Sequence, residues 1–317
     1  MTDEEFDQLR PSAFALAYRM LGSVSEAEDL VQEAFLRLHR AREGGQRIES
    51  PRAYLSTVVS RLALDQLRSA RVRRETYVGE WLPEPLVASD DDPARRLEMA
   101  DSLSLAFLVL LESLSPEQRA AFLLREVFDE PYDRIADIIR TSEQNARQLV
   151  TRARRHVEER RPRFETSRQQ REELATRFFA AAEEGDLEGL EKLLADDVVL
   201  HGDGGGKAPA VAHAIHGRAR VARALLGGLR AAVRVGGFTV RREQVNGQPG
   251  ALYFDRDGLL AGVMILDVAD GQIQAVSSIV NPDKLRHLGP VADLNALLRD
   301  GAGTRAERAH SKAERAH

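Results

Sequence analysis

The spacing of apolar residues changes along the chain from a helical to a strand-like period. In the first half, apolar residues recur every three or four positions through 30–38 and 55–67, which is typical of amphipathic helices. In the second half, helical patterns cover 171–184, 187–194 and 217–232. Short apolar runs between turn signals such as Asn-Gly and Asp-Gly predict strands at 198–201, 238–245, 251–254, 259–268 and 272–280. We therefore expect a helical first half and an α+β second half with a curved antiparallel sheet.

The N-terminal domain is predicted to contain three helices. Apolar positions in 6–21 indicate the first helix, which Gly22 ends. Ser25 is the expected N-cap of the second, and acidic residues follow in its first turns, where negative charge favours the helix dipole. A loop at 44–50 precedes Pro51, which suits the first position of a third helix.

Two short helices joined by a tight turn are predicted within 131–155. Ile135 and Ile138 have the spacing of a buried face on the first of these helices. Thr141 is the expected N-cap of the second, and Gln144, three residues on, completes a capping box. This combination favours a helix-turn-helix, whose second helix enters the major groove of DNA.

The second of these helices has one apolar and one polar face. On a helical wheel with about 100° per residue, Leu149, Val150 and Ala153 fall on the side of Ala146. The other side carries amides and guanidinium groups, which read base edges and hold phosphates. These residues are Gln144, Arg147, Gln148, Thr151, Arg152 and Arg155. An isolated basic helix would fit a solvated surface stripe, but the preceding helix and turn favour a recognition helix.

Composition and charge narrow the class of protein. The chain has 317 residues, enough for two or three domains, and it has no cysteine, which excludes disulfides and thiolate metal sites. A formal net charge of −5 argues against coating nucleic acid by bulk electrostatics, yet basic residues cluster at 61–74 and 140–163. The acidic start lacks a signal-peptide pattern, and no apolar run reaches transmembrane length, so we expect a cytoplasmic protein.

Two helices of the N-terminal domain carry candidate contact residues. Asp29 and Glu33 lie on an acidic face of the second helix, which is either merely solvated or suited to a basic partner. The third helix has Tyr54 near its start and Arg61 and Arg68 further along. An aromatic ring followed by arginines can stack an unpaired base and hold a single strand. A core tyrosine and a fraying basic terminus would give the same pattern.

The N-terminal half resembles the extracytoplasmic-function (ECF) sigma factors of bacterial RNA polymerase. AEDLVQEAFLRL and PRAYLSTVVSRLALDQLR are similar to their region 2, and LSPEQRAAFLLREVFDEPYDRIADIIRTSEQNARQLVTRARR to their region 4. The resemblance spans 6–157 and implies two all-α sigma domains. It implies polymerase contacts through Asp29, Leu30, Gln32, Glu33 and Phe35. It implies contacts with the −10 element through 44–50, Tyr54 and Arg61. The arginines further along the third helix, Arg68 and Arg71, are candidate DNA contacts from their position on that helix. It implies reading of the −35 element by Arg147, Gln148, Thr151 and Arg152.

The turn between the two short helices departs from this family pattern. Arg140 stands where these proteins usually have glycine. Glycine suits a left-handed helix end and arginine does not, so the turn is expected to be altered or strained.

The predicted linker at 75–100 contains WLPEPL at 81–86. Its prolines favour an extended course, and Trp81, Leu82 and Leu86 are too apolar for a free linker. WLPEPL is similar to a linker signature of the sigma subgroup with a C-terminal extension. HGDGGGKAPA and NPDKL look like further signatures of that subgroup, and the element order resembles the SnoaL-like, nuclear-transport-factor-like cone, which encloses a pocket.

These three distant signatures lack a local reason to exist, which suggests that they meet. We expect the linker to dock beside the loop 203–207, with 281–285 close by, and to hold the DNA-reading domains at an unproductive separation. The residues of this regulatory interface are Trp81, Leu82, Pro83, Asp203, Gly204, Gly205, Gly206, Lys207, Asn281, Pro282 and Asp283.

Catalytic chemistry in the second half has little support. The glycine-rich segment 202–207 is one residue short of a phosphate-binding loop, and Ala208 replaces the Ser or Thr that would hold magnesium. The histidines within 201–216 are too irregularly spaced for a metal site. Asp203 and Asp267 are the candidate carboxylates if catalysis survives in the pocket. We expect no metal, no cofactor and no enzymatic activity.

The whole chain is therefore predicted to be a multidomain sigma factor. The expected pieces are region 2 at 1–74, a linker at 75–100, region 4 at 101–165, a SnoaL-like domain at 170–288 and a tail at 289–317. The expected partners are core RNA polymerase, promoter DNA and a small-molecule ligand of the pocket, with no membrane. The free protein is expected to be a monomer. The alternatives are a pocket enzyme with an added DNA-binding module and a ligand-sensing repressor.

Overall fold

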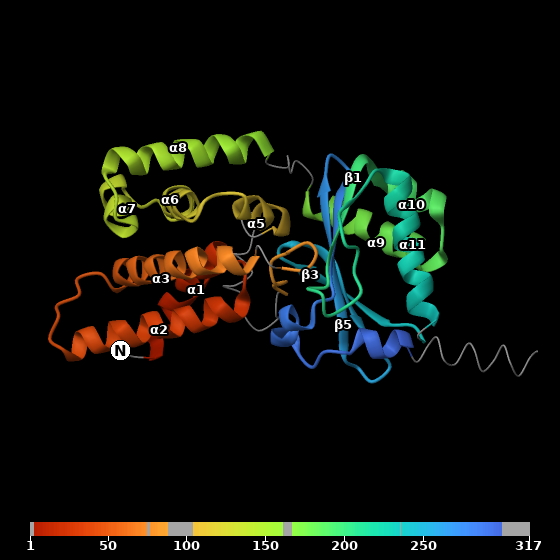
Figure 1. The fold of residues 1–317 in the computed structure, drawn as a ribbon, viewed down its shortest axis with the longest axis horizontal. Coiled ribbons are helices and arrows are strands. Elements are labelled where there is room, and N and C mark those ends of the chain that lie inside the picture. The colour runs from red at the N-terminus through yellow and green to blue at the C-terminus, as the bar shows by residue number, and fades with distance from the viewer. Residues whose placement is uncertain (1–2, 75–76, 88–103, 161–166, 235, 300–317) are drawn as a thin grey trace, which may run out of the picture. The chain divides into compact units, whose positions relative to one another are not determined.

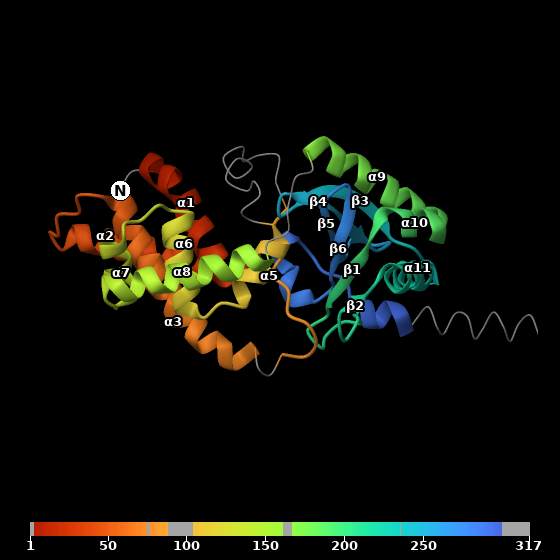
Figure 2. The ribbon, with the colours of Figure 1, turned by 90° about the horizontal axis from the view of Figure 1, so that it is seen from above.

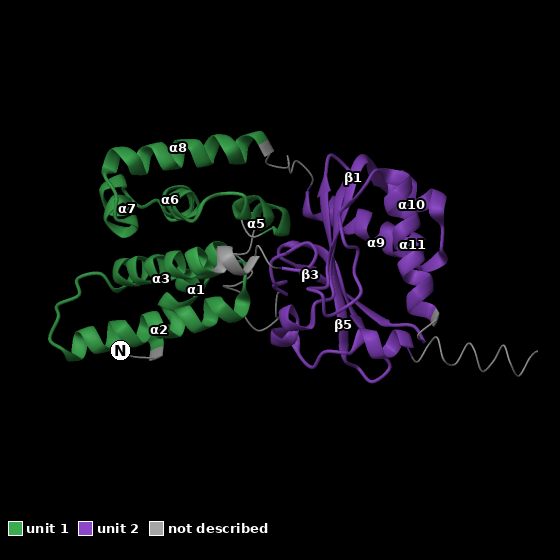
Figure 3. Cartoon of the chain, in the orientation of Figure 1, with its two compact units in different colours: residues 1–76, 89–162 green, residues 77–88, 163–317 purple. Residues whose placement is uncertain are grey.

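The computed structural model divides the chain into two compact units, coloured green and purple in Figure 3. It describes residues 3–74, 77–87, 104–160, 167–234 and 236–299. The first unit contains 1–76 and 89–162, and the second contains 77–88 and 163–317. The linker predicted at 75–100 is thus not a separate piece, because its first part belongs to the unit of the C-terminal half. The rest of that linker and the tail beyond residue 299 lie outside the described residues.

The first part of unit 1 is a bundle of three helices around an apolar core. They are α1 Asp3–Leu21, α2 Val24–Glu43 and α3 Pro51–Arg74. Tyr18 is fully buried and stacks with Phe14 at 5.9 Å between ring centroids. Ser23, not Ser25, caps α2, since its hydroxyl accepts a hydrogen bond from the Glu26 N–H at 3.2 Å.

The second part of unit 1 has the predicted helix-turn-helix. Its helices are α5 Leu105–Glu112, α6 Pro116–Glu126, α7 Tyr132–Ile139 and α8 Glu143–Arg160. The N-cap of α8 is one residue later than predicted: the Ser142 hydroxyl accepts from the Asn145 N–H at 3.2 Å, while Thr141 Oγ1 accepts from the Asn145 side chain at 2.7 Å. Arg140 keeps the left-handed conformation, with φ 57° and ψ 55°, so the turn is retained and its residue is strained.

A buried arginine joins the two parts of unit 1. Arg119 on α6 is 2% exposed, and its guanidinium donates to the Leu111 carbonyl at 2.9 Å and to the Met20 carbonyl of α1 at 2.6 Å. It also pairs with Glu112. The two parts therefore share an interior contact that depends on a satisfied charge.

Unit 2 is a six-stranded mixed sheet with helices on one face, as Figures 1 and 2 show. The strands lie in the order β2-β1-β6-β5-β4-β3. They are β1 Leu194–Asp203, β2 Ile215–His216, β3 Thr239–Val245, β4 Gln248–Phe254, β5 Leu260–Ala269 and β6 Gln272–Ile279. The predicted antiparallel sheet is found except at one pair of strands: β1 pairs with β6 in parallel, with Leu200 opposite Val276. The crossover between these strands is supplied by the intervening helix and hairpins.

The helices of unit 2 close one side of this sheet over an apolar core. They are α9 Arg168–Glu184, α10 Leu187–Leu193 and α11 Arg218–Arg234, followed by the short 3₁₀ helices η1 Pro282–Lys284 and η2 Arg286–Leu288. Phe178, Leu190 and Val221 pack in the core with Leu266 and Val276 of the sheet. In the part of the chain that is described, no helix is long and apolar enough to cross a membrane.

Candidate nucleic-acid interface

The polar face predicted for the second helix of the helix-turn-helix is exposed on α8. The opposite face of α8 is buried and packs against the rest of the domain through Ala146, Val150, Ala153 and Val157. The exposed residues are Gln144, Arg147, Gln148, Thr151, Arg152 and Arg155. Apart from Arg155, these residues line one open hollow, a geometry that suits contact with base edges and phosphates.

Some of these side chains are held by neighbouring charged or aromatic groups, and others are not. The Arg147 guanidinium lies 4.4 Å from the ring centroid of Tyr132 on α7 and pairs with Glu143. Arg155 pairs with Glu159 at 3.5 Å. Arg152 makes no ion pair with any described residue. Arg152 is therefore the guanidinium on this face that is ready to bind without first breaking an ion pair.

The candidate DNA contacts on α3 are largely engaged by unit 1 itself. The Tyr54 hydroxyl is 3.5 Å from the Arg37 carbonyl, and its ring is half-buried. The Arg61 guanidinium donates to the side chain and the carbonyl of Asp137 on α7, each at 3.1 Å. Arg68 donates to Glu117 of α6 at 3.0 and 3.1 Å. Arg71 lies on α3 beyond the side chains that the structure describes.

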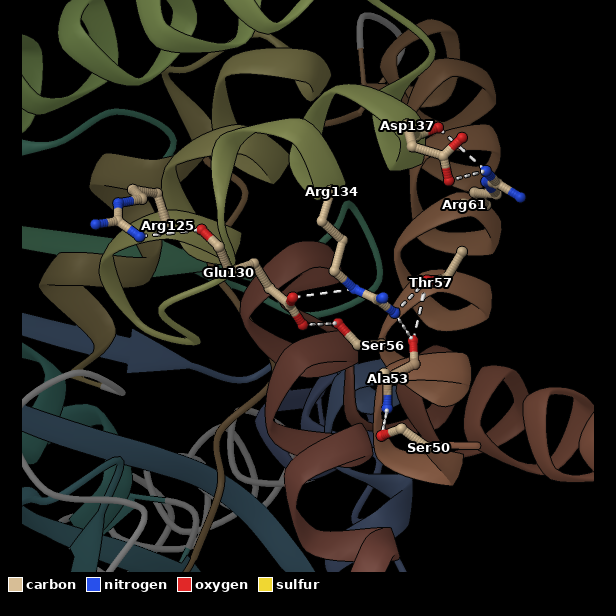
Figure 4. A network of polar contacts seen from close by, with 9 residues as sticks. All are labelled: Ser50, Ala53, Ser56, Thr57, Arg61, Arg125, Glu130, Arg134 and Asp137. Atoms are coloured by element: carbon tan, nitrogen blue, oxygen red, sulfur yellow. Dashed lines mark hydrogen bonds and ion pairs between the residues drawn. The ribbon is translucent and has the colours of Figure 1, made fainter. Parts of the chain in front are cut away.

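A network of polar contacts centred on Arg134 and Glu130 lies beside the Arg61–Asp137 pair at the junction of α3 and α7 (Figure 4). Arg134 donates to the Ala53 carbonyl and to the Thr57 hydroxyl, the latter at 3.1 Å. The Ser56 hydroxyl donates to Glu130 at 3.1 Å, and Glu130 also pairs with Arg134 at 3.0 Å. The face of α3 that carries Arg61 is therefore covered by the helix-turn-helix half of unit 1.

The exposed stripe of α2 differs from the residue set implied by resemblance. Asp29, Gln32 and Glu33 reach solvent, as expected. Leu30 and Phe35 do not: they are 5% and 4% exposed and pack in the core. These two side chains hold the helix in place, so direct contact with a partner does not fit this structure. Leu36, which the predicted set omits, is 48% exposed and extends the stripe by one helical turn.

The segment 77–87 docks on the C-terminal half through Asp203 at the end of β1. The Asp203 carboxylate is fully buried and accepts hydrogen bonds from the Leu82 N–H at 2.8 Å and the Tyr77 hydroxyl at 2.5 Å. Burial and the Asp203 carboxylate raise the pKa of Tyr77. The Asn281 side chain donates to the same hydroxyl at 2.8 Å, which ties NPDKL to the linker.

Lys284 neutralises Asp203 and sits between two rings of the docked segment. Its ammonium is 2.6 Å from Asp203 Oδ2 and donates to the Leu82 carbonyl. It lies 4.1 Å from the Trp81 ring centroid and 5.1 Å from that of Tyr77. A buried ammonium with an anion, a carbonyl and two aromatic faces is fully satisfied. Lys284 and Tyr77 were absent from the predicted interface, although Lys284 is the fourth residue of NPDKL.

The far end of the docked segment is fixed at the β3–β4 turn. The Leu86 N–H donates to Asn246 Oδ1 at 2.9 Å, and the Asn246 N–H donates to the Leu86 carbonyl at 2.8 Å. His287 contacts the Pro85 carbonyl at 2.8 Å. Leu82 and Leu86 are buried, so the segment is held by apolar burial as well as by hydrogen bonds.

The glycines of the 203–207 loop allow close approach between backbones. A Cβ on Gly205, whose φ is +57°, would lie 2.2 Å from Asn281 Nδ2. A Cβ on Gly204 would lie 2.1 Å from the Ala208 carbonyl oxygen. Lys207 pairs with Asp283. The loop thus packs closely against other parts of its own chain, which is the role that the sequence predicted for its glycines.

A cavity of about 490 Å³ lies between the sheet and helices α9 and α11. Phe178, Leu225 and Met264 are among its lining residues. Neither Asp203 nor Asp267 lines it, so the expectation of pocket carboxylates is wrong. The neighbours of Asp267 on β5, Leu266 and Val268, pack in the core under the helices, so Asp267 faces the other side of the sheet. No cluster able to hold a metal ion occurs among the described residues.

Family models cover most of the chain. The Sigma-70 region 2 model matches residues 6–73, the Sigma-70 region 4 model matches 104–157, and the SnoaL-like domain model matches 175–276. These three matches follow the order of the helical parts and the α+β half described above.

Similar proteins match over nearly the full length. The ECF RNA polymerase sigma factor SigJ of Mycobacterium tuberculosis H37Rv is 40% identical over 296 residues, covering 90% of this chain and 93% of SigJ. The probable ECF RNA polymerase sigma factor SigI from the same organism is 36% identical over 282 residues, covering 85% and 90%. A crystal structure of SigJ aligns with a TM-score of 0.74 and 36% identity, covering 92% of this chain and 100% of that one.

Proposed function

Because the chain belongs to the ECF sigma factors of RNA polymerase, it binds core polymerase and directs promoter-specific transcription initiation, and we propose how its residues divide this work. The −35 element is read by Arg147, Gln148, Thr151 and Arg152, and Gln144 and Arg155 are further DNA contacts of the same helix. The −10 element is bound by residues 44–50, Tyr54 and Arg61, with Arg68 and Arg71 as further DNA contacts. Core polymerase is bound by the α2 stripe of Asp29, Gln32, Glu33 and Leu36.

The exposed face of α8 supports the first of these assignments. Its guanidinium and amide groups point away from the buried face of Ala146 and Val150, as required for a helix that lies in a groove. The assignment of α3 requires that Arg61 leave Asp137. A DNA phosphate carries one negative charge and two free oxygens and can accept two hydrogen bonds from a guanidinium, as a carboxylate does, so it can replace Asp137 as the partner of Arg61.

The second half of the proposal is regulation in cis by the SnoaL-like domain. The docked segment 77–87, held at Asp203, is the observation that carries it. Region 2 ends just before this segment and region 4 begins after it, so a docked linker tethers both DNA-reading parts to the regulatory domain. A released linker would give region 2 and region 4 a longer free connection and a wider range of separations.

The SnoaL-like domain is proposed to act by binding a small molecule rather than by catalysis. The carboxylates considered for chemistry lie outside the cavity, and His201, the imidazole among its described lining residues, is engaged by Glu80 at 2.7 Å. We further propose that the free chain is a monomer. These proposals distinguish the chain from a pocket enzyme with an added DNA-binding module and from a repressor. Neither of those alternatives needs the α2 stripe.

Transcription in vitro tests the function. Core RNA polymerase with the wild-type chain should produce transcript from a cognate promoter, and the Arg152→Ala chain should produce less. A chain carrying Asp203→Asn, which leaves Lys284 without its buried partner, should release the linker and alter promoter output. Lys207→Ala is the control, because it removes a more exposed pair on the same loop. Equal output from wild type and Asp203→Asn would contradict regulation through this contact.

A further inference from the structure

One loop serves both the linker site and the cavity. Its first limb, from Asp203 to Gly206, contacts the docked segment: Asp203 holds Leu82, and Gly206 lies against Val78. Its second limb, Pro209 to Val211, forms part of the cavity wall. The limbs are joined tightly, because the Lys207 and Ala208 N–H groups both donate to the Gly204 carbonyl, at 2.9 and 3.0 Å.

The second limb is also pressed against β1. A Cβ on Gly202 would lie 2.5 Å from Val211 Cγ2 and 3.1 Å from its backbone nitrogen. Gly202 immediately precedes Asp203, whose carbonyl accepts from Val280 and Asn281. Val211 therefore packs directly on the backbone of Gly202, one residue before the carboxylate that holds the linker.

The cavity has the chemistry of a site for an uncharged molecule. Among the described residues that line it there is no Asp, Glu, Lys or Arg, and apolar side chains dominate. His201 also lines it, but its Nδ1 already hydrogen-bonds Glu80 at 2.7 Å. The volume of about 490 Å³ suits a small organic ligand. A charged ligand would lose its hydration against a mostly apolar wall, which is strongly unfavourable.

Tyr253 supplies a hydrogen-bond donor in this wall. Burial raises the pKa of its phenol, so the hydroxyl stays protonated. The Tyr253 hydroxyl donates to the Met264 sulfur, a weak acceptor, at 3.5 Å. A ligand carbonyl or ether oxygen would be a better acceptor for the same O–H.

We propose that the cavity binds a neutral, mainly apolar small molecule with one hydrogen-bond acceptor for Tyr253, and that its occupancy shifts linker docking through the loop 203–211. This regulation rests on the proposed function, in which the docked linker restrains the sigma domains. The ligand changes docking by the ratio of its affinities for the docked and released states.

The cavity is tested with the fluorescent neutral probe N-phenyl-1-naphthylamine and the full-length chain. Gly228→Leu should fill the cavity, because Gly228 lines it and a Cβ there meets nothing within 4 Å. Gly227→Leu is the matched control: it lies next on α11, also has open space, and does not line the cavity. We expect at least ten-fold weaker probe binding by Gly228→Leu and unchanged binding by Gly227→Leu. Equal binding by both variants would overturn the site.

The ligand class is tested by displacement of this probe. Benzophenone and diphenylmethane differ by one carbonyl, so benzophenone should compete about five-fold better, the value of an ordinary hydrogen bond. Tyr253→Phe should abolish that difference while retaining probe binding. Preference for the anionic 8-anilinonaphthalene-1-sulfonate over the neutral probe, or a benzophenone preference that survives Tyr253→Phe, would refute the assigned class.

Coupling is read from a fluorine label, because the chain has one tryptophan. With 5-fluorotryptophan at Trp81, benzophenone should move the ¹⁹F resonance in the wild-type chain and in Gly227→Leu, but not in Gly228→Leu. Asp203→Asn should move it without ligand. Cavity binding with no ¹⁹F change, while Asp203→Asn moves the signal and alters transcription, would refute coupling and leave the proposed function standing. No ¹⁹F or transcription change in Asp203→Asn would instead refute the proposed regulation through the docked linker.

Discussion

At the scale of single residues, the site depends on how each charge is satisfied. Asp203 is buried but meets an ammonium and two hydrogen-bond donors, so its charge stabilises the docked segment. Arg61 is not buried in this way, and its exposed ion pair with Asp137 contributes little to the stability of the fold. The difference suits their proposed roles, one as a firm anchor and the other as a contact that DNA can replace.

The first prediction concerns reading of the −35 element by α8. Replacing Arg152 with alanine should weaken binding of a −35 duplex by about 1–3 kcal/mol if the guanidinium contacts a base. Replacing Arg155, near the end of the exposed face, should weaken binding to all DNA sequences alike. It should also reduce the slope of log Kd against log salt concentration by about one. Fluorescence anisotropy with cognate and scrambled duplexes distinguishes the two. Unchanged binding by both variants would remove this face from DNA recognition.

The second prediction concerns the buried Asp267. Burial, partly opposed by His201, raises the pKa of this carboxyl from 3.8 to about 7, and Oδ1 has no hydrogen-bond partner among the described residues. Since the folded-state pKa lies above the unfolded one, the proton stabilises the fold below about pH 4, and this contribution is lost as pH rises through about 7. Asp267→Asn, which cannot ionise, should not lose this stability as the pH rises.

Thermal unfolding at several pH values measures this effect. The Tm of Asp267→Asn minus that of the wild type should increase from pH 4 to pH 7 and then level off. Taking the difference cancels the other carboxyl groups that titrate in the same range. A difference that stays constant between pH 4 and 8 would show that Asp267 does not titrate there.

At the scale of elements, the spacing of apolar residues predicted the helices and their exposed faces. It did not predict features that depend on residues distant in the sequence. Helix α8 and its exposed face followed from side-chain spacing alone. The caps of α2 and α8 were misplaced because a neighbouring hydroxyl, Ser23 or Ser142, fits the first turn better than the one chosen. The parallel pairing of β1 with β6 could not be read from either strand, because it depends on the path of the chain between them.

The candidate site shows the same division. Family resemblance named Leu30 and Phe35 as contact residues, whereas packing against residues such as Phe6 decided their burial. The three linker signatures could be identified as unexplained, but the cation that joins them, Lys284, became recognisable only from its position between Trp81 and Tyr77. Asn246, which fixes the far end, gives no signal beyond its turn-forming Asn-Gly pair.

The third prediction concerns the α2 stripe. Reversing Asp29 and Glu33 to lysine should abolish core-polymerase binding, since both charges project to one side of the helix. Leu36→Ser should weaken binding by about 1–2 kcal/mol through lost apolar contact. Far-ultraviolet circular dichroism should remain helical in both. Retained affinity in a pull-down with core polymerase would exclude this stripe as the interface.

The fourth prediction concerns the contact of α3 with α6 and α7. Asp137→Ala with Glu117→Gln removes the carboxylates that engage Arg61 and Arg68. Each exposed pair is worth at most about 1 kcal/mol, so affinity for a −10 single strand should rise by roughly two- to ten-fold. Asp129→Asn is the control, because it removes an exposed carboxylate that pairs with Arg125 and with no arginine of α3. An equal gain in the control would indicate a general charge effect.

At the scale of the whole molecule, the docked segment changes how the sigma domains are connected. Without docking, residues 75–103 form one connection between region 2 and region 4, of about 95–105 Å at full extension. With 77–87 bound to the SnoaL-like domain, that connection is divided, and each DNA-reading part is tied separately to unit 2. Regulation can then act on distance alone, without altering the faces of α3 or α8.

The last prediction tests this division through Trp81. In the intact chain its ring is half-buried, with the Lys284 ammonium over one face, and a ring shielded from water emits at shorter wavelength than free tryptophan. Asp203→Asn and truncation after Arg168 should both shift the emission toward that of free tryptophan and should change transcription in the same direction. Lys207→Ala should do neither. Emission that is already fully solvent-like in the intact chain and does not respond to truncation would mean that the linker is undocked in solution, and regulation by tethering would then be wrong.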